Sequence, residues 1–105
     1  MIRSLAARFS LLLLVAAGPA LATEIPKEQL DSDFKSCMET CKQSADETKC
    51  TSFCNCTNDE AKAQFSYEEY QQLAADLNAA KPANPDSLNK LKSIGSSCKA
   101  KYLQP

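Results

Sequence analysis

Six cysteines are the residues of this chain best suited to chemistry, and five of them fall within twenty residues. They are Cys37, Cys41, Cys50, Cys54, Cys56 and Cys98. The first four form two Cys-x3-Cys pairs, and Cys56 follows the second pair closely. Reduced thiolates at such spacings bind copper(I) or zinc, or exchange disulfides with a partner. Oxidised cysteines would instead act as structural disulfides, so the two states predict different kinds of protein.

The spacing of the cysteines predicts a particular disulfide pairing. Residues four apart on a helix share one face, because each residue turns the helix by about 100°. If the two pairs lie on consecutive antiparallel helices, Cys41 comes opposite Cys50 and Cys37 comes opposite Cys54. Cys56 lies about 200° around the helix from Cys54 and faces away from this seam. The sequence therefore predicts the bridges Cys37–Cys54, Cys41–Cys50 and Cys56–Cys98.

We favour structural disulfides over a thiol metal or redox site. The cysteine number is even, and a short exported chain with six cysteines is typical of a disulfide framework. Zinc sites more often use two complementary pairs with a two-to-four spacing, whereas Cys54 and Cys56 point to opposite sides of a helix. No metal and no cofactor are therefore expected, and the periplasmic thiol metal-binding or redox protein is kept as the alternative.

The twin Cys-x3-Cys hairpin is similar in arrangement to that of the small chaperones of the mitochondrial intermembrane space. The resemblance covers only Cys37, Cys41, Cys50 and Cys54. Those proteins lack a cleaved secretory signal of the type described below, and this chain adds Cys56, Cys98 and two further helices. We interpret the likeness as shared geometry and assign no family.

The first 22 residues have the features of a secretory signal peptide. Arg3 and Arg8 make the start basic, an apolar run extends from Leu11 to Ala17, and Ala20-Leu21-Ala22 is a typical cleavage site. Removing 22 of the 105 residues leaves 83, which is a single domain for which disulfides are a common source of stability. We expect a periplasmic or secreted protein with no membrane span after cleavage of the signal.

The mature chain carries no histidine, and its net charge is small. Histidine is the most common general base and the usual partner of a catalytic serine or cysteine, so we predict that the protein is not an enzyme. Ten lysines against thirteen acidic residues give the mature chain a charge of −3, without the basic footprint of a nucleic-acid-binding protein. The adjacent acids Asp59-Glu60 and Glu68-Glu69 are expected to lie next to helix starts, where the helix dipole favours acidic side chains.

Apolar residues repeat at helical spacing, and no segment shows sustained strand alternation. Residues 23–31 are predicted to be a flexible N-terminal arm and residues 32–105 a disulfide-stabilised helical domain. The first helix is expected to begin near Ser32 or Asp33 and to end at residues 43–45. Ser44 and Glu47 form a capping box that predicts the start of the second helix.

Two further helices have clear start signals. Ser66 and Glu69 form a capping box, flanked by Phe65 and Tyr70 at the staple positions, and predict a third helix that runs to about residue 78. Asn84 as cap and Pro85 at the first helical position predict the fourth. Within it, Gly95 marks either a close helix crossing or a tolerated glycine. Tyr67 and Tyr70 are expected to be half-buried core residues, with a ligand cleft as the alternative.

These observations predict an all-α, small disulfide-stapled bundle of about four short helices built on the Cys-x3-Cys/Cys-x3-Cys helical hairpin. The expected function is that of a small exported, non-catalytic binding or interaction module whose partner is an unidentified protein. A secreted effector or toxin is the third possibility, and the absence of a strong apolar or cationic surface run argues against membrane disruption. Oligomeric state does not follow from the sequence.

Overall fold

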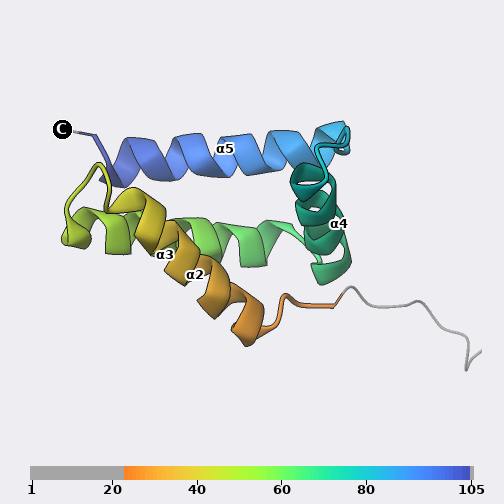
Figure 1. The fold of residues 1–105 in the computed structure, drawn as a ribbon, viewed down its shortest axis with the longest axis horizontal. Helices are drawn as coiled ribbons and strands as arrows, with labels where there is room; N and C mark the ends of the chain where they lie inside the picture. Colours follow the sequence, from red (N-terminus) through yellow and green to blue (C-terminus); the bar gives the residue numbers. More distant parts are fainter. Residues whose placement is uncertain (1–22, 105) are drawn as a thin grey trace, which may run out of the picture.

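The computed structural model describes residues 23–104, and within them it contains four helices and no strand (Figure 1). The helices are α2 (Lys27–Cys41), α3 (Glu47–Gln64), α4 (Tyr67–Asn78) and α5 (Pro85–Tyr102). This confirms the predicted all-α bundle of four short helices on a helical hairpin. The predicted signal peptide, residues 1–22, lies outside the described residues.

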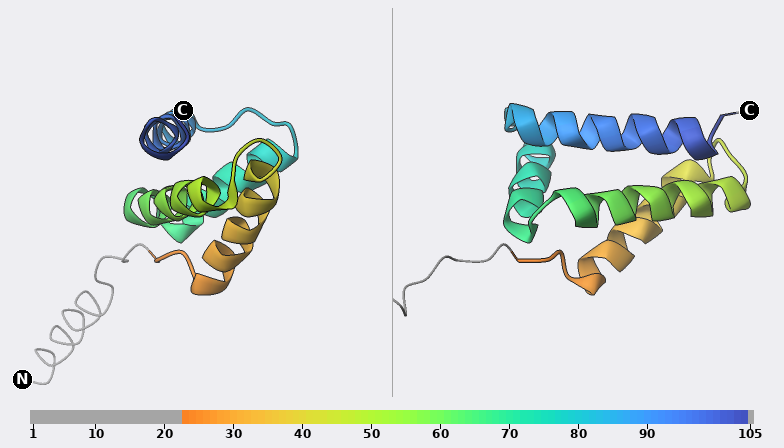
Figure 2. Two further views of the ribbon diagram at one scale, coloured as in Figure 1. Left: turned by 90° about the vertical axis from the view of Figure 1, so that its left-hand side faces the viewer. Right: turned by 180° about the vertical axis from the view of Figure 1, so that it is seen from behind.

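The central element is α3, which contacts both α2 and α5. α3 and α5 run antiparallel, α2 crosses α3 obliquely, and α4 stands across the end where α3 finishes and α5 begins (Figures 1 and 2). Because Cys56 faces away from the Cys50–Cys54 side of α3, the two neighbouring helices cover different faces of α3. No helix formed by residues 23–104 has an apolar stretch long enough to span a bilayer.

Buried side chains form two clusters along this frame. One lies towards α4 and is made by Ile25, Ala61, Phe65, Leu73, Ile94 and Cys98. The other lies at the closed end of the α2–α3 hairpin and is made by Cys41, Cys50 and Cys54. Cystines therefore make up the buried part of the second cluster, whereas the first combines aliphatic and aromatic side chains with the buried Cys98.

The predicted start of the first helix, near Ser32 or Asp33, is wrong. α2 begins at Lys27, directly after Pro26, so residues 27–31 are helical where an arm was expected. The residues before the helix also pack: Ile25 is 3% exposed, and the Tyr67 N–H donates to the Thr23 carbonyl at 2.8 Å. The start precedes the predicted one because Leu30 continues the apolar face of Phe34 by one turn and joins the first cluster.

The second helix also begins differently from the prediction. Its cap is Asp46, whose carboxylate accepts from the Lys49 N–H at 2.8 Å. Ser44, the predicted cap, lies in the preceding turn, where its N–H donates to the Cys41 carbonyl at 3.0 Å. Asp and Ser are equally good caps, so the position of the turn decided between them.

The predicted starts of the other two helices are confirmed. Ser66 caps α4 by accepting from the Glu69 N–H, and Asn84 caps α5, which has Pro85 in its first turn. The Phe65 and Tyr70 rings meet edge to face with centroids 5.8 Å apart, as the hydrophobic staple predicts. The capping box is incomplete, however, because the Glu69 side chain bonds to α5 as described below.

Candidate functional site

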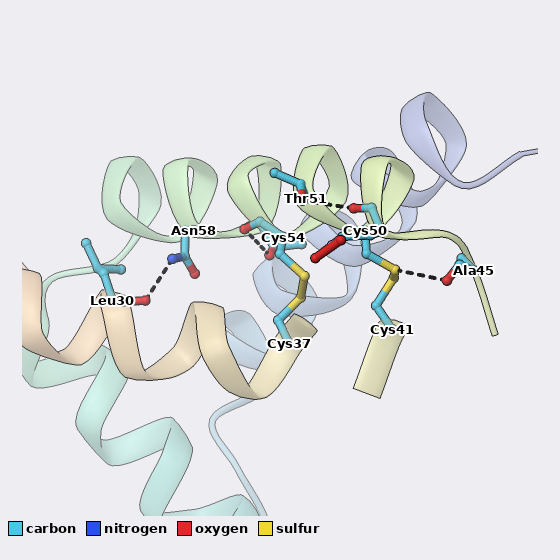
Figure 3. Close-up of a disulfide and its surroundings, with 10 residues drawn as sticks. Leu30, Cys37, Cys41, Ala45, Cys50, Thr51, Cys54 and Asn58 are labelled. Atoms are coloured by element: carbon cyan, nitrogen blue, oxygen red, sulfur yellow. Dashed lines mark hydrogen bonds between the residues drawn. A yellow bond between two sulfur atoms is a disulfide. The ribbon is translucent and has the colours of Figure 1, made fainter. Parts of the chain in front are cut away.

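The structure contains the three predicted disulfides, and Figure 3 shows the two that close the hairpin. The paired Cα atoms lie 5.9 Å apart in Cys37–Cys54, 5.7 Å in Cys41–Cys50 and 5.8 Å in Cys56–Cys98. All six cysteines of the chain lie in the described part and none is free. The oxidised protein therefore has no thiolate for metal binding or exchange, and residues 23–104 bring no cluster of three potential metal-ligating side chains together.

Every disulfide uses α3 as one of its two helices. Cys54 and Cys50 hold α2 against one side of α3, while Cys56 holds α5 against another side. A hydrogen bond extends the α2–α3 contact beyond the bridges, since the Asn58 side-chain N–H donates to the Leu30 carbonyl at 2.8 Å (Figure 3). α2, α3 and α5 therefore form one covalently fixed frame.

α4 is attached to this frame by polar contacts from Glu69. One carboxylate oxygen accepts from Lys90 Nζ at 2.8 Å, and the other accepts from the Ser87 hydroxyl at 2.6 Å. The Lys90 ammonium also lies 4.7 Å from the centre of the Phe65 ring. The hydrogen bond from Lys90, followed by that from Ser87, lowers the pKa of Glu69 below its ordinary value, so the carboxylate remains charged at neutral pH.

A second polar contact joins α4 to α2. The Tyr70 hydroxyl donates to Asp33 Oδ2, and the Gln29 side-chain N–H donates to Asp33 Oδ1 at 3.0 Å. Burial, and then the bond to Asp33, raise the pKa of Tyr70 well above its ordinary value, so the hydroxyl keeps its proton. Asp33 was considered above as a helix cap, whereas here it is an internal residue of α2 that faces α4.

All four helices contribute to a pocket of about 190 Å³ that lies between them and is partly open to solvent, which we call the interior pocket. Its polar wall is formed by Asp33, Thr57, Asn58 and Tyr70. Its apolar wall includes Ala61 of α3 and Leu91, Ile94 and Gly95 of α5. A Cβ placed on Gly95 would have no atom within 4 Å, so the glycine does not mark a close helix crossing and opens instead onto this pocket.

A wider groove of about 670 Å³ is lined by residues 24–26, by the N-terminal part of α2 and by α3. Its apolar lining residues are Pro26 and Leu30, which are half-buried, and Ile25, which is buried. Charges of both signs surround them, with Lys27 and Asp31 from α2 and Asp59 and Lys62 from α3. Asn55 and Asn58 of α3 add neutral polar groups to the same groove.

The predicted site residues, the six cysteines, are thus brought together as predicted. Tyr67 and Tyr70 are both half-buried, and Tyr70 also lines the interior pocket. Sequence reasoning missed Asp33, Asn58 and Glu69 as cross-helix ties. No motif marks Asp33 or Asn58, and the capping-box motif assigns Glu69 to a contact within its own helix. The roles of all three depend on how the helices cross, and the misplaced helix start also concealed that Asp33 belongs to a helix face.

Comparison of the chain with protein-family models, curated proteins and solved structures found no match. The candidate sites are therefore defined by their geometry alone.

Proposed function

We propose that this protein is an exported, non-catalytic binding module that presents the groove between α2 and α3 to an extended segment of a partner protein. The main observation behind the proposal is that α2 and α3, the two helices that line the groove, are fixed to each other. α2 and α3 are joined by two disulfides and by the bond from Asn58 to Leu30, so the groove exists before a partner arrives. A preformed surface loses little conformational entropy on binding.

The composition of the groove supports a polypeptide as its occupant. Apolar surface from the part-exposed Pro26 and Leu30 is surrounded by lysines and aspartates, which is the pattern of a protein interface with an apolar centre and a polar rim. A nucleic-acid site would need an excess of basic residues, whereas this groove carries both signs in similar number. The signal-peptide features and the three disulfides support an oxidising, exported location.

Site-specific photo-crosslinking in the native compartment tests this proposal. A photoreactive phenylalanine derivative replaces Lys62, which lines the groove, or Lys92, an exposed lysine on α5 that does not. We expect a discrete protein adduct from position 62 that is absent from position 92. No adduct at position 62, or the same adducts at both positions, would contradict the proposal.

The alternative of a thiol metal or redox protein needs free thiols, and the structure has none among its six cysteines. Free thiols or bound copper or zinc in protein purified from its native compartment would favour that alternative. No observation on the described residues favours the secreted effector or toxin.

A further inference from the structure

We propose that the interior pocket where the four helices meet binds a small organic amine with an apolar body. This inference goes beyond the proposed function, because the pocket and the groove share only Asn58 among their lining residues. It rests on the size of the pocket, on its apolar wall and on the hydrogen-bonding state of its polar wall.

The size of the pocket limits the ligand. Its volume of about 190 Å³ is below the range of roughly 300–1,000 Å³ that is usual for drug-sized ligands. A cavity of roughly 150 Å³ is sufficient for benzene. The pocket therefore fits a single ring, or an aliphatic body of similar size, with a short polar chain.

The apolar wall is formed where α5 faces α3. Leu91 and Ile94 present aliphatic side chains, and Ala61 and Gly95 present almost none, which leaves the volume between them open. Ile94 is 3% exposed and Ala61 is 7% exposed, whereas Leu91 and Gly95 are half-buried, so this wall extends from the core towards the surface. It favours a ligand with an apolar body, because burial of that body removes apolar surface from water.

The polar wall is rich in acceptors, and most of its donors are already in use. The Thr57 hydroxyl donates to the Cys54 carbonyl at 3.0 Å, the Asn58 amide donates to the Leu30 carbonyl, and the Tyr70 hydroxyl donates to Asp33. A ligand that needs donors, such as a carboxylate or a phosphate, finds only the second Asn58 N–H uncommitted among these groups. A ligand that supplies donors is favoured instead.

Asp33 adds an uncompensated negative charge to this wall. Its carboxylate accepts one bond from Gln29 and one from Tyr70, whereas a carboxylate has about four acceptor positions. No ion pair found in residues 23–104 involves Asp33, and no lysine lines the pocket. An ammonium group beside Asp33 would supply both the missing charge and the missing donors.

Binding of 2-phenylethylamine to the mature, disulfide-bonded protein tests the proposal, with 2-phenylethanol as a neutral control of the same shape. We expect saturable amide shifts in nuclear magnetic resonance spectra around Ala61 and Gly95 on addition of the amine. The alcohol is expected to bind about tenfold more weakly, which is the effect of losing a charged hydrogen bond. Equal affinity for amine and alcohol, or no saturable binding of the amine at millimolar concentration, would overturn the proposal.

Two variants and one control test where the amine binds. Asp33→Asn keeps an acceptor for Tyr70 and should weaken amine binding about tenfold, so that amine and alcohol bind alike. Asp31→Asn, on the groove side of the same helix, should leave the affinity unchanged. Gly95→Leu should fill the pocket and abolish binding of both probes, and folding is checked by the retained disulfides and helical circular dichroism. Unchanged amine binding in Asp33→Asn or in a folded Gly95→Leu protein would refute the assignment.

Discussion

Glu69 shows how one side chain can join two helices of a small protein. Sequence patterns assign it to the start of α4, yet its carboxylate reaches α5 and accepts from both Ser87 and Lys90. The Glu69 and Lys90 side chains are 29% and 33% exposed, so solvent screens part of their attraction. The contact therefore contributes moderately to stability, and its contribution depends on pH.

Replacing Glu69 by Gln should lower the free energy of unfolding by about 1 kcal/mol at neutral pH. The folded-state pKa of Glu69 is lowered, so its contribution is complete above the ordinary value of 4.5 and is lost as the pH falls through the lowered value. Denaturant unfolding of the wild type and the variant at neutral and acid pH measures this difference. Glu39→Gln, at an exposed position of α2, is the control. If the difference in unfolding free energy between wild type and Glu69→Gln did not change with pH, the charged contact of Glu69 with α5 would be contradicted.

Tyr70→Phe removes the hydroxyl that bonds Asp33 and should cost about 1–2 kcal/mol at neutral pH. Because burial raises the pKa of Tyr70 in the folded state, this contribution is complete below the ordinary value of 10.0 and is lost as the pH rises towards the raised value. Unfolding experiments on both proteins at neutral and alkaline pH test the sign. The variant Tyr102→Phe, at an exposed position, should behave as wild type. If the stability lost in Tyr70→Phe increased with pH, the hydrogen bond from Tyr70 to Asp33 would not explain it.

The helical elements could be predicted to different extents. Spacing alone predicts the hairpin and the three bridges, since four-residue periodicity fixes which cysteines share a face. Ser66 and Asn84 are unambiguous caps because each precedes a clear apolar stripe, whereas Ser44 and Asp46 compete within one turn. The start of α2 was missed because Pro26, which permits a helix to begin immediately after it, was interpreted only as part of an arm. The groove and the interior pocket depend on how the helices cross, and no sequence period encodes that.

Removing single disulfides should have unequal effects. Cys56 and Cys98 are 42 residues apart, and the chain-entropy model gives roughly 4 kcal/mol for this bridge. Cys41 and Cys50 are 9 residues apart and lie inside the loop that Cys37–Cys54 already closes, so this bridge should contribute less than the roughly 2.5 kcal/mol of an isolated one. Paired Cys→Ala variants in denaturant unfolding provide the comparison. If removing either bridge lowered the free energy of unfolding equally, changes in the native state would outweigh the difference in loop-closure entropy of the unfolded chain.

Across the molecule as a whole, stability should be unevenly distributed. α2, α3 and α5 are linked covalently, whereas α4 carries no cysteine and is attached by packing and by the Glu69 and Tyr70 bonds. Native-state hydrogen exchange should show α4 amides opening at a lower free energy than those of α3. Glu69→Gln should speed exchange in α4 and leave α3 protected. Equal protection of both helices would mean that the bundle opens only as one unit.

The positions of the bridges also determine what a protease can achieve. The turn between α2 and α3 lies between Cys41 and Cys50, and both later connections, on either side of α4, lie between Cys56 and Cys98. A single cut at any interhelical connection therefore leaves one covalent molecule, heavier by a water and otherwise intact in composition. In an environment rich in peptidases, this chain tolerates a first cleavage without losing a fragment, and the fragments separate only after reduction.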